Sequence, residues 1–112
     1  MSGITTHVLD TSRGRPAAGV PVTLEREAAD GWTLIGQGST NADGRISDLT
    51  SGDSIEPGVY RLNFETAAYF AAQNVGGFYP QVTVTFRIED PSQHYHVPLL
   101  LNPFGYSTYR GS

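Results

Sequence analysis

The clearest strand pattern in the chain is the run Gln81-Val82-Thr83-Val84-Thr85-Phe86-Arg87-Ile88-Glu89. From Val82 to Ile88, apolar side chains occupy every second position, and threonine or arginine fills the positions between them. Such a period of two is typical of a β-strand with one face on a core and the other in solvent. This segment therefore predicts a sheet that is covered on one side by another layer.

Further segments of the same kind lie on both sides of it, separated by turn-forming Gly and Pro. They are Ile4–Asp10, Val20–Glu27, Trp32–Thr40, Val59–Thr66, His94–Leu101 and Tyr106–Arg110. Ala67–Asn74 breaks the alternation and predicts a short helix, whereas the polar stretch Ser47–Gly58 predicts a loop. We expect an all-β antiparallel sandwich of seven to eight strands with one short helix, formed by residues 1–112 as a single domain.

Composition narrows the possible functions. The 112 residues include seven arginines, no lysine and 11 acidic residues, for a net charge of −4, which argues against binding to nucleic acid or an anionic membrane. The absence of cysteine excludes disulfides, thiolate catalysis and cysteine-ligated metals. No apolar run approaches the roughly 20 residues of a membrane span, and no secretory signal pattern is visible, so we expect a cytoplasmic protein.

Three histidines are the side chains best suited to proton transfer near neutral pH. His94 and His96 are two residues apart on an expected strand, so both point away from the core, and His7 faces away from the core on the first strand. One interpretation is that all three are merely exposed polar positions on a half-solvated sheet. Another is that neutral imidazoles from the pair and from His7 bind zinc, although spacing alone is weak support for it.

Two other features could contribute to a site. Arg45 follows the turn Asp43-Gly44, and a guanidinium beside imidazoles would orient an anionic or carbonyl-rich ligand. The C-terminal segment Tyr106–Ser112 is rich in hydrogen-bonding groups. Leu100 shares the face of the histidines, which indicates that another subunit covers this face. The sequence has neither a nucleophile elbow for a catalytic serine nor a phosphate-binding loop.

The chain resembles the transthyretin-like 5-hydroxyisourate hydrolases over essentially its whole length. The segments that carry the resemblance are Thr6–Asp10, Gly14–Ala17, Thr40–Arg45, Phe78–Pro80, Val82–Val84, His94–Leu100 and the closing Tyr109-Arg110-Gly111-Ser112. The closing tetrapeptide is the hallmark of these enzymes and separates them from transthyretin, a hormone carrier of the same fold. One departure is Asn102, which stands at a turn where we expect serine.

The resemblance implies hydrolysis of 5-hydroxyisourate to 2-oxo-4-hydroxy-4-carboxy-5-ureidoimidazoline in urate degradation, by attack of a histidine-activated water on a ring amide. It implies a catalytic set and a substrate-binding tail, with neither a metal nor a cofactor. The catalytic set is His7, Arg45, His96 and Ser112. The residues expected to bind substrate are His7, Arg45, His96, Tyr109, Arg110, Gly111 and Ser112. His94 matches the pattern without a principal catalytic role.

The resemblance also implies a homotetramer, a dimer of dimers, with the active sites at the interface between dimers. Two alternatives stay open. One is a transthyretin-like carrier of a small molecule without catalysis, which has no need for the histidines and the closing tetrapeptide. The other is a zinc hydrolase that uses all three histidines as ligands.

Overall fold

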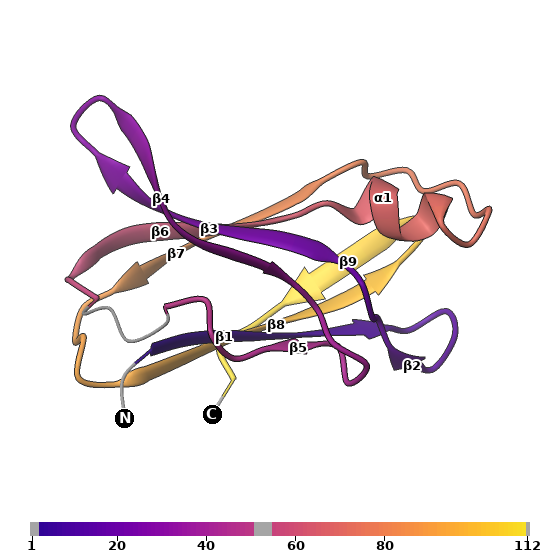
Figure 1. Ribbon diagram of the computed structural model, residues 1–112, viewed down its shortest axis with the longest axis horizontal. Coiled ribbons are helices and arrows are strands. Elements are labelled where there is room, and N and C mark those ends of the chain that lie inside the picture. Colours follow the sequence, from indigo (N-terminus) through magenta and orange to yellow (C-terminus); the bar gives the residue numbers. More distant parts are fainter. Residues whose placement is uncertain (1–2, 51–54, 112) are drawn as a thin grey trace.

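A computed structural model describes residues 3–50 and 55–111 as two β-sheets packed face to face, with one short helix at the end of the sandwich (Figure 1). The described elements are β1 (Gly3–Asp10), β2 (Arg15–Pro16), β3 (Pro21–Ala28), β4 (Gly31–Ser39), β5 (Arg45–Ile46), β6 (Gly58–Phe64), α1 (Thr66–Ala71), β7 (Val82–Ile88), β8 (His94–Asn102) and β9 (Gly105–Thr108). The first sheet has the order β2-β1-β8-β9, with β5 also on β1, and the second has the order β4-β3-β6-β7.

The expected sandwich and short helix are confirmed, with differences in detail. The described residues form nine strands, two of which, β2 and β5, have two residues each and lie outside the segments expected as strands. The sandwich is not antiparallel throughout, since β1 and β8 run parallel over their whole paired length. A parallel pair needs a long connection, and here all the residues between β1 and β8 provide it. Such a distant pairing leaves no local sequence signal.

The core lies between the two sheets and follows the expected alternation. Val82 and Ile88 at the ends of β7 are buried, as are Tyr60 and Leu62 of β6. The stretch Ser47–Gly58 contributes more to this core than its polar composition suggests, because Leu49 and Ile55 are both buried. These two apolar residues anchor the described parts of the loop against the sheets.

Asp10, at the end of β1, joins the first sheet to the helix. It is 1 % exposed, and its Oδ2 accepts a hydrogen bond of 2.7 Å from the hydroxyl of Tyr69 in α1. Its Oδ1 accepts from the backbone N–H and hydroxyl of Ser12. Burial by itself raises the pKa of Asp10, but the hydrogen bonds outweigh it and bring the pKa below its usual value. Asp10 is thus a structural carboxylate, held ionised by its donors.

Gly44 ends the turn before β5, at a position where any side chain would be strained. Its φ is +74°, and a Cβ there would lie 2.4 Å from the carbonyl oxygen of Val8 in β1. The backbone carbonyl of Gly44 also accepts a hydrogen bond of 2.7 Å from the N–H of Val8. The turn is therefore pressed directly against the strand that carries His7.

We expect Gly44→Ala to lower the free energy of unfolding by about 3 kcal/mol, from positive-φ strain together with backbone overlap. Gly14→Ala is the matched control, since Gly14 has φ +64° but no described atom within 4 Å of the added Cβ. The control should cost only about 1–2 kcal/mol. Urea unfolding of both variants measures the difference, and equal losses would contradict the close packing of the turn.

Candidate active site

The outer face of the first sheet brings together three of the sequence-predicted site residues. β5 pairs with β1 so that Arg45 lies directly opposite His7. On the other side of β1, the parallel register sets Thr5 opposite His96 and His7 opposite Pro98. Residues paired across neighbouring strands project to the same face. Arg45, His7 and His96 therefore share one face, contributed by three adjacent strands.

A side-chain cap holds the turn that presents Arg45. The side-chain Oδ1 of Asn41 accepts hydrogen bonds from the backbone N–H groups of Asp43 and Arg45, at 2.9 and 3.0 Å. The backbone of Asn41 closes the same turn, donating to the carbonyl of Arg45 and accepting from Gly44. Such a doubly bonded turn fixes the direction in which the strand leaves it. Arg45 is consequently delivered at a defined place beside His7, although its side chain is exposed.

Thr5 is a member of this site that the sequence analysis missed. Its hydroxyl oxygen lies 2.8 Å from Nδ1 of His96 and 2.9 Å from Nε2 of His94. A bond to Nδ1 orients the imidazole of His96 and leaves its Nε2 free for a ligand. The signal that could have found Thr5 is the parallel register of β1 and β8, which local patterns do not give.

The electrostatic surroundings favour neutral His96. Burial lowers its pKa below the ordinary 6.5, and the positive charges of Arg45, His7 and His94 lower it further. Above the lowered pKa the imidazole is neutral and has a lone pair available for a proton. His96 is thus prepared to act as a base at neutral pH.

This shift gives a pH prediction. The acid limb of kcat/KM should fall at an apparent pKa below 6.5, because His96 in the folded protein resists protonation. The free energy of unfolding should also fall as the pH drops below 6.5, because the unfolded chain takes up the proton of His96 at a higher pH than the folded chain does. A pH–rate profile measures the limb. A limb at or above 6.5 would contradict the assignment.

The C-terminal segment closes against His96. The N–H of Gly111 donates a hydrogen bond of 2.8 Å to the carbonyl oxygen of His96, and the two residues form a β-bridge. The hydroxyl of Thr108 donates to the carbonyl of Pro98. A Cβ at Gly111 would lie 2.6 Å from Cδ2 of the His96 ring, so the backbone at this position touches the imidazole. Ser112, which the resemblance includes in the catalytic set, lies outside the described residues.

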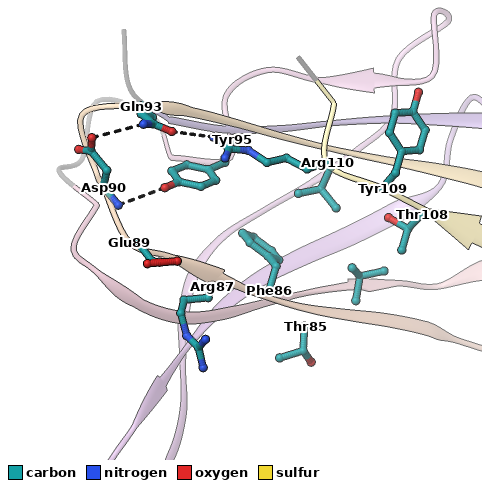
Figure 2. A pocket seen from close by; sticks show the side chains of 12 residues that line it. Thr85, Phe86, Arg87, Glu89, Asp90, Gln93, Tyr95, Thr108, Tyr109 and Arg110 are labelled. Carbon is teal, nitrogen blue, oxygen red and sulfur yellow. Dashed lines mark hydrogen bonds between the residues drawn. The ribbon is translucent and has the colours of Figure 1, made fainter.

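The side chain of Arg110 lies away from the imidazoles of the three histidines. Its guanidinium lies 4.3 Å from the ring centre of Tyr95, a core-facing residue. It also donates a hydrogen bond of 2.9 Å to the side-chain oxygen of Gln93 (Figure 2). These groups line a cleft of about 550 Å³ between β7 and the C-terminal end of the chain, together with Phe86 and Tyr109. The cleft holds none of the three histidines. The side chain of Arg110 is therefore not with the imidazoles in this structure, and its role in substrate binding stays a prediction.

The described residues show neither a cluster of metal ligands nor a membrane-spanning helix. Within residues 3–50 and 55–111, no group of three or more histidine, cysteine, aspartate or glutamate side chains is arranged to hold a metal ion. The ring nitrogens His94 Nε2 and His96 Nδ1 are instead engaged by Thr5. In the same part of the chain, no helix has the length and apolar character needed to span a bilayer.

Fold and site together define a small transthyretin-type β-sandwich with imidazoles and a guanidinium on the outer face of one sheet. The family model described as HIUase/Transthyretin family matches residues 4–111. The chain belongs to this family.

Individual relatives agree with this assignment. A 5-hydroxyisourate hydrolase of Salmonella dublin is 46 % identical over 109 residues, covering 97 % of this chain and 80 % of the relative. The solved Klebsiella pneumoniae 5-hydroxyisourate hydrolase superposes with a TM-score of 0.88 and 40 % identity, covering 100 % of both chains. Sea bream transthyretin in complex with thyroxine gives a TM-score of 0.90 at 35 % identity, covering 96 % of this chain and 93 % of that one. The fold thus occurs both in 5-hydroxyisourate hydrolases and in a transthyretin solved with bound thyroxine.

Proposed function

We propose that this chain hydrolyses 5-hydroxyisourate to 2-oxo-4-hydroxy-4-carboxy-5-ureidoimidazoline in urate degradation. The observation that carries the proposal is the placement of His7, Arg45 and His96 on one face, with the backbone of Gly111 against the His96 ring. Relatives named 5-hydroxyisourate hydrolase, 46 % identical over nearly the whole chain, support the same reaction. A purely structural sheet face would not need a neutral imidazole beside a cation.

The reaction is attack of water on a ring amide carbonyl, followed by cleavage of the carbon–nitrogen bond. His96 takes a proton from the water at Nε2, because its neutral form is favoured and its Nδ1 is held by Thr5. Arg45 donates hydrogen bonds to the carbonyl oxygen and stabilises the negative charge that develops on it. His7, directly opposite Arg45, positions the ring and the water. The departing nitrogen receives its proton from His96.

The C-terminal residues Tyr109–Ser112 complete the proposed site as a substrate-binding segment. Gly111 supports this role, because its backbone N–H is bonded to His96 and holds the segment along β8. A wall on this side brings the substrate close to the imidazole and limits the entry of water. The carrier alternative lacks a reason for this contact between a glycine and an imidazole.

We further propose a homotetramer, a dimer of dimers, with the sites between dimers. β7 and β9 are edge strands of their sheets in the described part of the chain, and unpaired edges invite pairing with a second copy. Leu9 and Leu100 lie half-buried on the same face as the histidines, where a second subunit would cover them. Sedimentation equilibrium tests the assembly, and a monomer at working concentration would contradict it. The cytoplasmic location stays a prediction.

The proposed activity is tested on freshly made substrate. Urate oxidase converts urate to 5-hydroxyisourate, and the decay of its absorbance is followed with and without this protein. We expect a decay that accelerates in proportion to protein concentration. Equal decay in both samples would refute the hydrolase and favour a carrier. Repeating the assay after treatment with a chelator, with and without added zinc, separates the zinc alternative: activity that needs zinc would support it.

A further inference from the structure

The hydroxyl of Thr5 links two imidazoles whose surroundings differ. It lies within hydrogen-bond distance of His96 Nδ1 and of His94 Nε2, at 2.8 and 2.9 Å. A hydroxyl has a single proton, so when it donates to one of the two nitrogens it can only accept from the other. The protonation of His94 and that of His96 are therefore coupled through one oxygen atom.

The two imidazoles that Thr5 links differ in exposure and in neighbouring charge. His94 is exposed, whereas His96 is half-buried. The charged or titratable groups that act on His96 are Arg45 from β5, His7 from β1 and His94 from β8. A positive charge is therefore costly on His96, which is desolvated beside Arg45. The same charge on His94 is stabilised by water.

We propose that Thr5 relays a proton between His96 and His94, so that the positive charge formed during water attack is carried at the exposed imidazole. The inference rests on the proposed hydrolysis and gives Thr5 and His94 a part in it. Both act through His96 and are relay residues, not groups that touch the substrate.

The relay balances within one turnover. In the starting state, His96 carries its proton on Nδ1 and donates it to Thr5, which donates to Nε2 of His94. When His96 Nε2 takes the proton of the attacking water, its Nδ1 proton moves to Thr5, and the Thr5 proton moves to His94. His96 is then neutral with a proton on Nε2, and His94 is an imidazolium.

The second half reverses these transfers. His96 Nε2 gives its proton to the departing ring nitrogen as the carbon–nitrogen bond breaks. As this proton leaves, Thr5 returns a proton to His96 Nδ1 and receives one from His94, so that His96 stays neutral and the starting state is restored. No electrons are transferred to or from the protein. The water supplies a hydroxyl to the carbonyl carbon and a proton to the nitrogen, and the new carboxyl group ionises to solvent.

Two substitutions test the relay. Thr5→Val removes the hydroxyl at nearly constant volume, and His94→Gln keeps an amide near the position of Nε2 that can hydrogen-bond to Thr5 but cannot hold a proton. We expect each to lower kcat by about tenfold or more with little change in KM. Because both break the same path, the double variant should lose no more than either single variant. Thr5→Ser should recover most of the wild-type kcat.

Thr83→Val is the matched control, since the Thr83 hydroxyl donates to Asn63 in the second sheet, away from the site. It should leave kcat unchanged. If Thr5 and His94 only support the ring of His96, His94→Gln should retain wild-type kcat, because its amide keeps the hydrogen bond. That result would overturn the relay, as would losses that simply add in the double variant.

A substrate-free readout separates this inference from the proposed function. Nitrogen-15 NMR of the histidine rings reports which ring nitrogen carries the proton. When the pH is lowered, the ring-nitrogen signals of His94 and His96 should shift together in the wild type. Thr5→Val should abolish this coupling, and Thr5→Ser should keep it. A chain that shows this coupling but no action on 5-hydroxyisourate would refute the proposed function alone. Absence of the coupling in an active enzyme would refute the relay alone.

Discussion

Replacing His96 with Asn is expected to lower kcat by about 10²–10⁴-fold while leaving the urea midpoint of unfolding unchanged. The amide of Asn reaches the position of Nδ1, so a hydrogen bond with the hydroxyl of Thr5 is preserved, but Nε2 and its basicity are lost. His96 lies on the outer face of β8, half-buried, and its side chain fills no part of the core. The substitution therefore removes chemistry without removing packing.

His96→Gln is the companion variant. Its longer side chain brings the amide close to the position of Nε2, where it can hydrogen-bond to water but not take up a proton at neutral pH. A comparable loss of kcat in both variants indicates that basicity at Nε2 is what the reaction needs. Wild-type kcat in either variant, measured by the decay of 5-hydroxyisourate absorbance, would remove His96 from the proposed mechanism.

Much of the fold follows from local pattern. The alternation from Val82 to Ile88 and the outward placement of His94 and His96 are as expected, because a period of two assigns each side chain to a face without knowledge of the partner strand. The pairing of β1 with β8 does not follow from local pattern. Gly3 and His94 are neighbours in the sheet but lie at opposite ends of the sequence.

That long-range pairing explains which parts of the site could be predicted. His7, Arg45 and His96 are chemically distinctive and are found from residue type and resemblance. Thr5 is an ordinary strand residue by composition, and only the register that sets it opposite His96 gives it a partner. Arg110 shows the opposite case: it belongs to the closing tetrapeptide, but its side chain stacks on Tyr95 on the other side of β8.

Gly111→Ala is the second substitution with a large expected effect, about 10²-fold in kcat, although it adds a single methyl group. The added Cβ would lie 2.6 Å from Cδ2 of His96 and 3.4 Å from Cγ of Pro98. Neither neighbour can yield freely, because Thr5 holds the ring at Nδ1 and the ring of Pro98 is buried in β8. Either the imidazole tilts, which moves Nε2, or the C-terminal segment leaves β8.

Gly105→Ala is the matched control for this prediction. Its added Cβ would come no closer than 3.7 Å to the side chain of Asn102, an ordinary contact, so we expect wild-type kcat. Both variants should unfold at the wild-type urea concentration, since neither position lies in the core. In a double-mutant cycle with Thr5→Val, the loss from Gly111→Ala should shrink, because a ring released at Nδ1 can move aside. Full activity of Gly111→Ala would show that the terminal segment does not need to lie against His96 during turnover.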